Sequence, residues 1–310
     1  MEFDFSHFNS KHWFPGHMLK ASRQIKDKLK LIDIAVILTD SRIPDSSINA
    51  ELVKILEHKA TMYAFSKADL AEKSVTAAWI KEYSKRGQVA VTTDIKNPRS
   101  LKEIIPAIRK AVAADRKKRG ATRPLLRPIR VMIIGVPNVG KSSLINALKG
   151  KKQTKTGQKP GVTRHQQWVT LADDMELLDT PGIMAPSGQG KEAELKMAVT
   201  NIIRQDLVGK EHISAYIYYQ LLRQNKVSRL SLYKIGADNL PADALALLSH
   251  IAKVRELKKT GDELDLKRAA DHFVLDFTNG KMGYLSLDLP EGFELELDES
   301  ITVKWNKKEL

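Results

Sequence analysis

Short apolar runs alternate with amphipathic segments over the first half of the chain. Runs with strand character are DIAVILT (33–39), TMYAFS (61–66), QVAVTT (88–93), RVMIIG (130–135), HQQWVTL (165–171) and MELLD (175–179). Between and around them, apolar residues recur with helical spacing at 20–32, 49–57, 74–87, 100–120 and 141–150. Strands that alternate with helices at this spacing predict an α/β domain with a mostly parallel, doubly wound sheet. Pro106 lies inside the 100–120 segment, so we expect that helix to be kinked or split.

From about residue 191 to about residue 280 the apolar pattern becomes helical throughout. It predicts helices at 193–208, 215–224, 241–259 and 264–277, which we interpret as a separate, small all-α domain. Small polar residues at 185–194 indicate a loop, and RGATRPLLRP (119–128) is the best candidate for a linker. The stretch 293–305 alternates like a hairpin, with a loose tail as the alternative.

The charge of the chain narrows the range of partners. Lysine and arginine exceed aspartate and glutamate by 14, and the isoelectric point is about 9.6. Two runs without any acid, 116–130 and 149–164, carry much of this surplus. Each run alone is compatible with a linker or a solvated face. The pair favours a surface that binds nucleic acid, since neutralising phosphates releases condensed counterions.

Composition also argues against several classes of site and location. The chain has no cysteine, which excludes disulfides and thiolate metal sites and is typical of a reducing compartment. No apolar stretch approaches the roughly 20 residues that span a bilayer. Residues 1–11 resemble neither a signal peptide nor a transit peptide. We therefore expect a cytoplasmic protein with no membrane and no disulfide partner.

A phosphate-loop motif lies between an expected strand and an expected helix. GVPNVGKS (135–142) satisfies the pattern G-x-x-x-x-G-K-[ST], in which backbone N–H groups wrap a phosphate at a helix N-terminus. Lys141 is expected to reach the β- and γ-phosphates, and the Ser142 hydroxyl to hold Mg²⁺. This segment contributes to the predicted site the residues Asn138, Val139, Gly140, Lys141, Ser142 and Ser143.

A second motif, LLDTPG (177–182), follows another apolar strand. Asp179 can hold the water shell of the metal, and the N–H of Gly182 can meet the γ-phosphate. Between the two motifs, KPGVTR supplies Thr163 as a second hydroxyl for Mg²⁺. In this order the segments predict a sensor of the γ-phosphate, because both loops contact a group that only the triphosphate carries.

A reader for the base is missing downstream of the phosphate loop, where no Lys-x-Asp ends an apolar strand. FSKADL (65–70) does end one, far upstream. Asp69 would accept from the guanine N1–H and exocyclic amine, and Lys67 would lie along the ring. Adenine lacks this pair of donors and would leave a buried carboxylate unpaired.

The next strand supports this assignment, because AVTTD (90–94) stands at its end and offers Thr93 for a further contact. The order is therefore base reader, ring support, phosphate loop, metal threonine and Asp-x-x-Gly. An ordinary guanine-nucleotide domain begins with the phosphate loop. The order thus predicts a circular permutation whose old ends are joined by the basic linker.

With these motifs the chain resembles the circularly permuted YlqF/RbgA family, the ribosome biogenesis GTPases A. The matching segments are WFPGHM (13–18), DSRIP (40–44), SKAD (66–69), GVPNVGKS, KPGVTRHQQW (159–168) and DTPG (179–182), and the similarity runs from about residue 12 to about residue 289. The resemblance implies a permuted Ras-like P-loop GTPase domain at 1–188, with a short N-terminal extension. A helical domain that binds RNA or the ribosome at 189–290 and a tail or hairpin at 291–310 would follow.

The same resemblance implies what the protein does. The expected activity is hydrolysis of GTP to GDP and phosphate, slow for the protein alone and stimulated by ribosomal particles. It would be coupled to a late step in assembly of the large (50S) ribosomal subunit. Basic surfaces would contact the rRNA of that subunit, and the expected cofactors are GTP or GDP and Mg²⁺.

Three positions bear on affinity and catalysis. The family has Asn where Ser66 stands; serine cannot reach the far edge of the purine, so we expect guanine preference through Asp69 with weaker affinity. Ile183 stands where signalling GTPases have a water-orienting Gln, and the candidate that the resemblance implies for this role is His17. Asn138 resembles the residue that binds K⁺ in potassium-stimulated GTPases, which makes K⁺ a further candidate ion.

Two alternatives stay open. The first is a permuted GTPase that acts on the small subunit, although such proteins usually carry an OB barrel and a zinc site, and this chain has no cysteine. The second is an RNA-binding assembly factor that holds nucleotide with little turnover, which Ser66 and Ile183 would be compatible with. Measured turnover would separate the second alternative from the GTPase.

Overall fold

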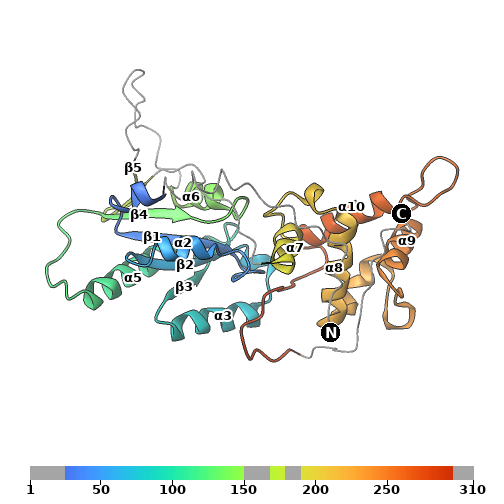
Figure 1. Ribbon diagram of the computed structural model, residues 1–310, viewed down its shortest axis with the longest axis horizontal. Coiled ribbons are helices and arrows are strands. Elements are labelled where there is room, and N and C mark those ends of the chain that lie inside the picture. Colours follow the sequence, from blue (N-terminus) through green and yellow to red (C-terminus); the bar gives the residue numbers. More distant parts are fainter. Residues whose placement is uncertain (1–24, 150–167, 179–189, 296–310) are drawn as a thin grey trace, which may run out of the picture. The chain divides into compact units, whose positions relative to one another are not determined.

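The computed structural model describes residues 25–149, 168–178 and 190–295 (Figure 1). These residues form two compact units. The first unit contains residues 25–149 and 168–178 together with 288–290, and the second contains 190–287 and 291–295. The domain boundaries expected from the sequence assign 288–290 to the helical part, whereas the structure groups these three residues with the first unit.

A six-stranded sheet forms the centre of the first unit, as far as its residues are described. The strands are β1 (Ile34–Asp40), β2 (Ala60–Ser66), β3 (Val89–Thr92), β4 (Ile129–Ile134), β5 (Trp168–Ala172) and β6 (Met175–Leu178). Their order across the sheet is β3-β2-β1-β4-β6-β5, and all pairs are parallel except β5 with β6. The predicted fold class is therefore confirmed, with strand bounds within a few residues of those expected.

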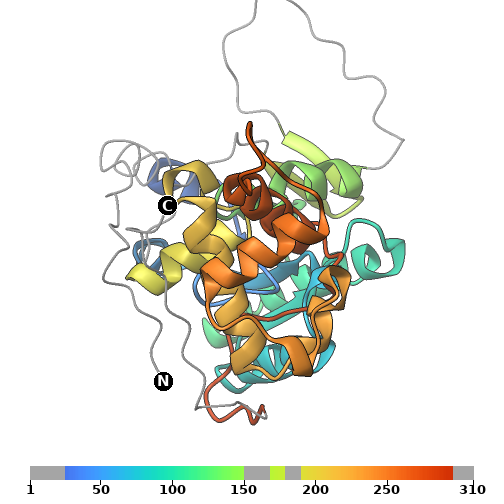
Figure 2. The ribbon, with the colours of Figure 1, turned by 90° about the vertical axis from the view of Figure 1, so that its right-hand side faces the viewer.

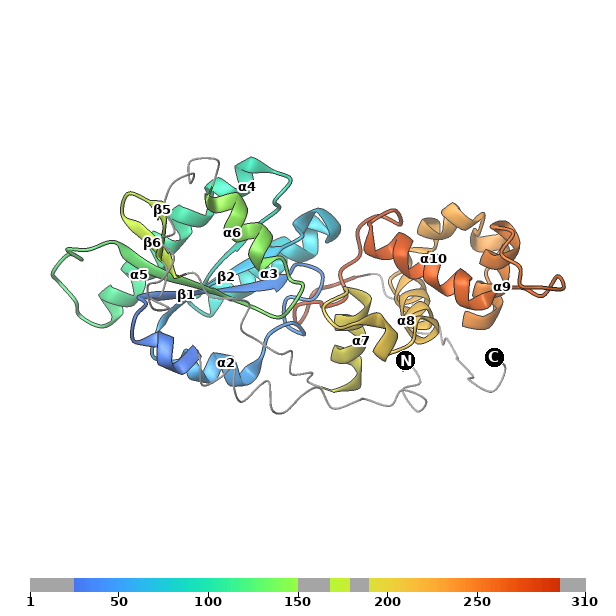
Figure 3. The same ribbon diagram turned by 90° about the horizontal axis from the view of Figure 1, so that it is seen from above.

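Helices of the first unit follow the predicted order. Residues 25–29, within the segment predicted as a helix at 20–32, are helical. The further helices are α2 (Ala50–Ile55), α3 (Lys73–Lys85), α4 (Pro98–Lys102), α5 (Ile104–Lys118) and α6 (Lys141–Lys149). Figure 3 shows α2 and α6 on opposite sides of the strands. The 100–120 segment is split at Glu103, which places Pro106 in the first turn of α5. There its missing N–H costs no intrahelical hydrogen bond.

Pairing between β1 and β4 joins the strands that precede the basic linker in sequence (β1 to β3) to the strands that follow it (β4 to β6). β1 is buried along its whole length, as expected for a strand that lies between parallel neighbours. Gly135 follows β4 and lies so close to β1 that a Cβ atom on it would stand 2.3 Å from the carbonyl oxygen of Leu38. A backbone oxygen within a strand cannot move away, so this position requires glycine.

The basic linker at 119–128 is anchored where it meets the sheet. The two terminal guanidinium nitrogens of Arg127, Nη1 and Nη2, donate to the carboxylate of Asp33 at 2.7 and 2.9 Å. The N–H of Arg130 donates to the same carboxylate at 2.8 Å. Burial alone would raise the pKa of Asp33, but the hydrogen bonds from Arg127 and Arg130 keep it below its usual value. These contacts fix the end of the basic linker to Asp33, immediately before β1.

The second unit is helical (Figure 2). Its helices are α7 (Lys191–Val199), α8 (Lys210–Arg223), α9 (Ala244–Val254) and α10 (Leu266–Thr278), with α10 packed against both α8 and α9. The helix expected at 193–208 ends at Val199, because Asn201 has a φ of 59° and the Thr200 hydroxyl bonds to carbonyl oxygens of the preceding turn. The loop expected at 185–194 is wrong at its end, since α7 begins at Lys191.

Two further sequence predictions concern the C-terminal residues and membrane-spanning segments. The hairpin or tail expected at 293–305 lies outside the described residues from 296 onward. Among the residues that are described, no helix is both long and apolar enough to cross a membrane.

The contact at Gly135 leads to a test of the fold. Gly135→Ala should destabilise the protein by about 1–3 kcal/mol, because the new methyl group overlaps a backbone oxygen. The apparent Tm of the nucleotide-free protein should fall by roughly 2–4 °C for each kcal/mol. Gly236→Ala is the control, since the nearest atom to its added Cβ is 3.9 Å away. An unchanged Tm for Gly135→Ala would contradict the close approach of β4 to β1.

Candidate functional site

Four parallel strands end at the edge of the sheet where the predicted site residues lie. β1, β2 and β3 end at Asp40, Ser66 and Thr92, and β4 ends at Ile134 immediately before the phosphate loop. Open α/β sheets bind their ligands outside the carboxyl ends of the strands. The topology thus brings the upstream SKAD segment to the same edge as the phosphate loop.

The phosphate loop contains two residues with positive φ, Asn138 at 55° and Gly140 at 103°. Glycine adopts this conformation freely, and asparagine does so more readily than most other residues. Asn138 is exposed, whereas Val139 is completely buried. Helix α6 begins at Lys141, so its first N–H groups have no partner within the helix and can bind an anion.

Lys141 is held by the loop that precedes it. Its ammonium group donates to the carbonyl oxygens of Gly135 at 2.6 Å and of Val136 at 2.7 Å. Burial lowers the pKa of Lys141 to about 8. A phosphate beside this ammonium group would raise the pKa again, because an opposite charge favours the protonated form.

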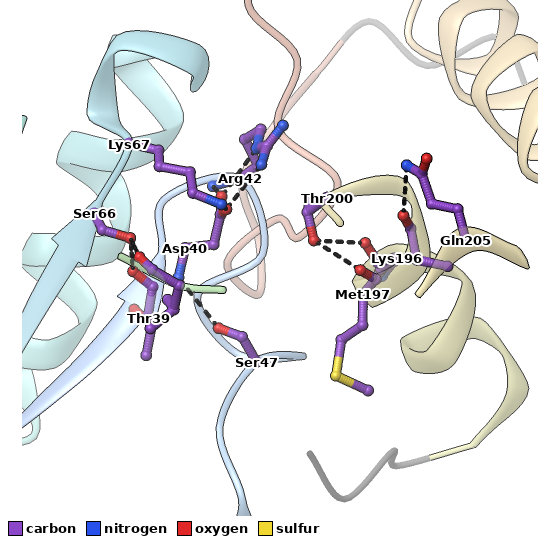
Figure 4. Close-up of polar contacts among 12 residues, drawn as sticks. Thr39, Asp40, Arg42, Ser47, Ser66, Lys67, Lys196, Met197, Thr200 and Gln205 are labelled. Carbon is purple, nitrogen blue, oxygen red and sulfur yellow. Dashed lines mark hydrogen bonds and ion pairs between the residues drawn. The ribbon is translucent and has the colours of Figure 1, made fainter. Parts of the chain in front are cut away.

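Ser66 connects three segments of the site (Figure 4). Its hydroxyl lies 2.8 Å from the carbonyl oxygen of Thr39 and 2.7 Å from that of Val139. A hydroxyl carries one proton, so it donates to one of these oxygens at a time. The end of β2 is thereby linked both to β1 and to the phosphate loop, which is a role that the sequence alone did not indicate for this serine.

The carboxylate of Asp40 lies buried between two cations (Figure 4). Arg42 donates to its two oxygens at 2.9 and 2.8 Å, and Lys67 Nζ stands 3.1 Å from Oδ2. Burial alone would raise the pKa of Asp40, but the charge and hydrogen bonds of Arg42, with the charge of Lys67, lower it to about 2. Asp40 is therefore ionised at every working pH, and it holds the side chain of Lys67 at the edge of the sheet.

Asp69 lies on the short 3-10 turn after β2 (Ala68–Leu70) and is partly exposed. Lys96 Nζ stands 2.6 Å from its Oδ2, and this hydrogen bond raises the pKa of Lys96. The Thr93 hydroxyl is buried and has no hydrogen-bond partner among the described residues. A ligand that offered donors to Asp69 would have to displace Lys96 or share the carboxylate with it.

A pocket of about 310 Å³ joins these segments. Among the predicted site residues, those that line it are Ser66, Lys67, Asp69, Thr93, Asn138, Val139, Gly140 and Ser143. Lys141 and Ser142 do not line this pocket but follow Gly140 directly at the start of α6, where Ser142 is exposed. The pocket thus brings residues of the SKAD segment and of the phosphate loop together, as the sequence predicts for the two parts of a nucleotide site.

The remaining predicted site residues lie outside the described part of the chain. They are His17, Thr163, Asp179 and Gly182. Among the described residues, no three His, Asp or Glu side chains form a cluster that could hold a metal ion. Trp168, which opens β5, is half-buried and has the guanidinium group of Arg130 over its ring at 4.8 Å.

Sequence reasoning missed the supporting role of Asp40 and Arg42, and the contact of Lys96. Asp40 and Arg42 belong to DSRIP, a segment that carries the family resemblance but to which the sequence analysis assigned no function. The feature that could have indicated their role is an acidic residue, Asp40, at the end of a buried strand. Lys96 stands just after AVTTD, and nothing in the local pattern indicated that it reaches Asp69.

Comparison with known proteins agrees with this geometry. A family model described as 50S ribosome-binding GTPase matches residues 130–214. Ribosome biogenesis GTPase A of Bacillus licheniformis is 38% identical over 281 residues, which cover 90% of this chain and 98% of that protein. The protein of the same name from Thermotoga maritima is 30% identical over 90% of this chain.

Solved structures give the same answer for the fold. The crystal structure of GNP-bound YlqF from T. maritima superposes with a TM-score of 0.61 and 26% identity, over 88% of this chain and 100% of that one. The GDP-bound structure of that protein superposes with a TM-score of 0.57 and 25% identity. One of these structures is thus a complex with GNP and the other a complex with GDP.

The contacts of Ser66 predict how affinity depends on its hydroxyl. Ser66→Ala should weaken GDP binding about fivefold, since one hydrogen bond to the loop carbonyl is lost. Ser66→Asn retains a donor for that carbonyl and has an oxygen that reaches further towards the purine, so it should bind GDP at least as tightly as the unaltered protein. Isothermal calorimetry with GDP measures both. Equal affinity of Ser66→Ala and the unaltered protein would contradict the role assigned to the hydroxyl.

The lowered pKa of Lys141 predicts a pH dependence of nucleotide affinity. Below about pH 8 the ammonium group is already charged, and above it a bound phosphate must recruit a proton. Affinity for GDP should therefore fall above about pH 8, by at most about tenfold per pH unit. Titration from about pH 7 to about pH 9, with calorimetry in two buffers of different ionisation enthalpy, measures the fall and the proton uptake. Lys96→Ala should show the same dependence, and constant affinity without proton uptake would refute the assignment.

Proposed function

The chain belongs to the ribosome biogenesis GTPase A family, and from this premise we propose that it hydrolyses GTP to promote assembly of the large ribosomal subunit. The observation that carries the proposal is the pocket in which the SKAD segment and the phosphate loop meet. A pocket of this composition supports binding of a guanine nucleotide. The name of the relatives and the description of the matching family supply the ribosomal partner.

Each described residue has a defined task in the proposal. Asp69 accepts from the two guanine donors after Lys96 has released it, and Lys67 lies along the purine ring. Ser66 keeps the phosphate loop against β2, and Lys141 neutralises the β- and γ-phosphates. Thr93 supports the base, and its buried hydroxyl without a partner favours a ligand contact there.

Metal binding and catalysis are assigned partly to residues that the structure describes and partly to residues outside the described ranges. The exposed Ser142 hydroxyl fits Mg²⁺, which prefers oxygen ligands and supplies charge compensation for the phosphates. Thr163 and, through water, Asp179 would complete its protein ligands. Asn138 is exposed in the loop and would hold K⁺. His17 would order the attacking water in place of the missing Gln.

The partner is expected to be rRNA of the large subunit, bound through basic surfaces. At the end of α5 and in the linker that follows, Lys117, Lys118 and Arg123 are exposed. Neighbouring Arg119 and Arg127 are bound to Asp115 and Asp33, so their charges are largely compensated. The uncompensated cations favour phosphate contacts whose strength falls with salt. We expect the protein to act on these subunits in the cytoplasm.

A second candidate is a passive RNA-assembly factor that holds nucleotide and rarely hydrolyses it. The observation that bears on this candidate is the hydrogen bond from Lys96 to Asp69, which competes with guanine. Such a competition lowers affinity and leaves the hydrolytic step unaffected. We therefore regard the GTPase as the better supported function.

Turnover of GTP by the purified protein tests the proposal. Large subunits should raise kcat by about a hundredfold or more if correct RNA architecture positions a general base at the attacking water. Small subunits should not stimulate it. Stimulation by small subunits alone would favour the alternative that acts on that particle, and no stimulation by either, with nucleotide still bound, would favour the passive factor.

His17→Ala in the same assay separates catalysis from docking. The variant should still sediment with large subunits but lose most of the stimulation. His58→Ala is the matched control, because that imidazole is exposed on the surface of the first unit. Normal stimulation of His17→Ala would remove the catalytic assignment while leaving the GTPase in place.

A further inference from the structure

Asp288 belongs to the first unit although it follows the whole helical region in sequence. It is 5% exposed. Its Oδ2 accepts the N–H groups of Asp45 at 3.0 Å and Ser46 at 2.7 Å, and its Oδ1 accepts the Ser46 hydroxyl at 2.7 Å. A carboxylate that accepts several such donors is a strong local anchor.

The backbone of Asp288 extends this anchor to neighbouring elements. Its N–H donates to the carbonyl oxygen of Arg42 at 3.1 Å. Its carbonyl oxygen accepts the indole N–H of Trp79 on α3 at 3.1 Å. Asp288 is thus bound to both ends of the turn that follows β1, at Arg42 and at Asp45–Ser46.

This turn also holds the base-reading segment. Arg42 donates two side-chain hydrogen bonds to Asp40, and the same carboxylate attracts Lys67 at 3.1 Å. Lys67 itself has a left-handed backbone, with a φ of 54°. A lysine in that conformation keeps it only where surrounding contacts fix the segment. The contacts therefore run from Asp288 through the turn to Lys67 in an unbroken series.

We propose that Asp288 is a positioning residue for the guanine site: it fixes the 40–47 turn so that Asp40 holds Lys67 where the purine ring binds. The proposal rests on the role of Lys67 given under the proposed function. It adds to the site a residue that the linear motifs leave out. Asp288 is the first residue of the first unit after the helical region, so this residue would act on the nucleotide site from within the same unit.

Within the second unit, the chain just before Asp288 is held as well. Gln224 on α8 donates to the carbonyl oxygen of Ser286 at 3.0 Å, and to Gln220 at 3.2 Å. Gln220 in turn donates to the hydroxyl of Tyr216, which donates to Glu192 on α7. Residues on both sides of the passage from Leu287 to Asp288 are therefore fixed to their own units.

Calorimetry with GDP and with pyrophosphate on the full chain tests the proposal. Asp288→Ala should weaken GDP binding about tenfold while pyrophosphate binding changes less than about twofold, since Lys67 acts at the base and Lys141 at the phosphates. Lys67→Ala should weaken GDP binding in the same way. The double variant should be no weaker than Lys67→Ala alone, because residues that act in series are not additive.

Glu291→Ala serves as the control, and Ser46→Ala serves as a second, milder test of the proposal. Glu291→Ala removes one negative charge from an exposed position three residues downstream and should leave GDP affinity unchanged. Ser46→Ala removes only the hydroxyl bond to Oδ1 and should weaken GDP binding about threefold. It keeps the proposal testable if Asp288→Ala does not fold.

The outcomes separate this proposal from the function it rests on. Equal loss of GDP and pyrophosphate affinity, or additive effects in the double variant, would reduce Asp288 to a structural residue and overturn the proposal. A loss in Lys67→Ala without a loss in Asp288→Ala or Ser46→Ala would also overturn it and leave the guanine site intact. No loss in Lys67→Ala would instead remove the assignment of the base reader.

Discussion

Parallel pairing of β1 with β4 is the constraint on which the site depends. In its register Ile37 of β1 stands opposite Ile134, the last residue of β4, so β1 continues for three residues beside the phosphate loop. Those residues end at Asp40, which stands opposite Ser66 of β2. One strand thereby aligns the phosphate loop on one side with the SKAD segment, the proposed base reader, on the other, whatever their order in the chain. This is why a permuted order is compatible with an intact site: hydrogen bonds across the sheet, and not the connections, set the geometry.

The charged cluster at the end of β1 has a specific energetic character. Two cations and one fully buried carboxylate are costly to desolvate, and such a cluster is weak evidence for stability by itself. Its value lies in geometry, since Arg42 takes both carboxylate oxygens in a bidentate pair and leaves Lys67 one direction of approach. Lys67 is still partly exposed, so it can contact a ligand without leaving Asp40. A flexible side chain is thus given one position before any nucleotide arrives, which reduces the entropy lost on binding.

Sequence patterns predicted what depends on local order, and missed what depends on contacts between distant segments. Apolar runs located each described strand, and Pro106 predicted the split between α4 and α5 because its effect is confined to one helical turn. Ser66 is an example of a contact that was missed. The sequence indicates only that serine is shorter than the asparagine found at this position in the family. The hydrogen bond from Ser66 to Val139 depends on the distance between β2 and the phosphate loop, which the sequence does not give. The same holds for Lys96 and Asp69, which come from two different strand ends. The grouping of 288–290 with the first unit could not be predicted either, because the three residues carry no periodic signal.

The chain passes between the two units more than once, and the positions of two of these connections matter for a GTPase. It leaves the first unit after β6, where the Asp-x-x-Gly motif follows, and it returns at Asp288. A γ-phosphate sensed at the first connection would act on the helical unit through α7. If Asp288 fixes the base-reading segment, an RNA bound to the helical unit would act back on nucleotide affinity through the second connection. Thermodynamic linkage requires such reciprocity: a partner that binds one nucleotide state more tightly must strengthen the binding of that nucleotide by the same factor. Under the proposed assignment of the site, these two of the connections would give each end of the nucleotide, the phosphates and the base, its own covalent link to the helical unit.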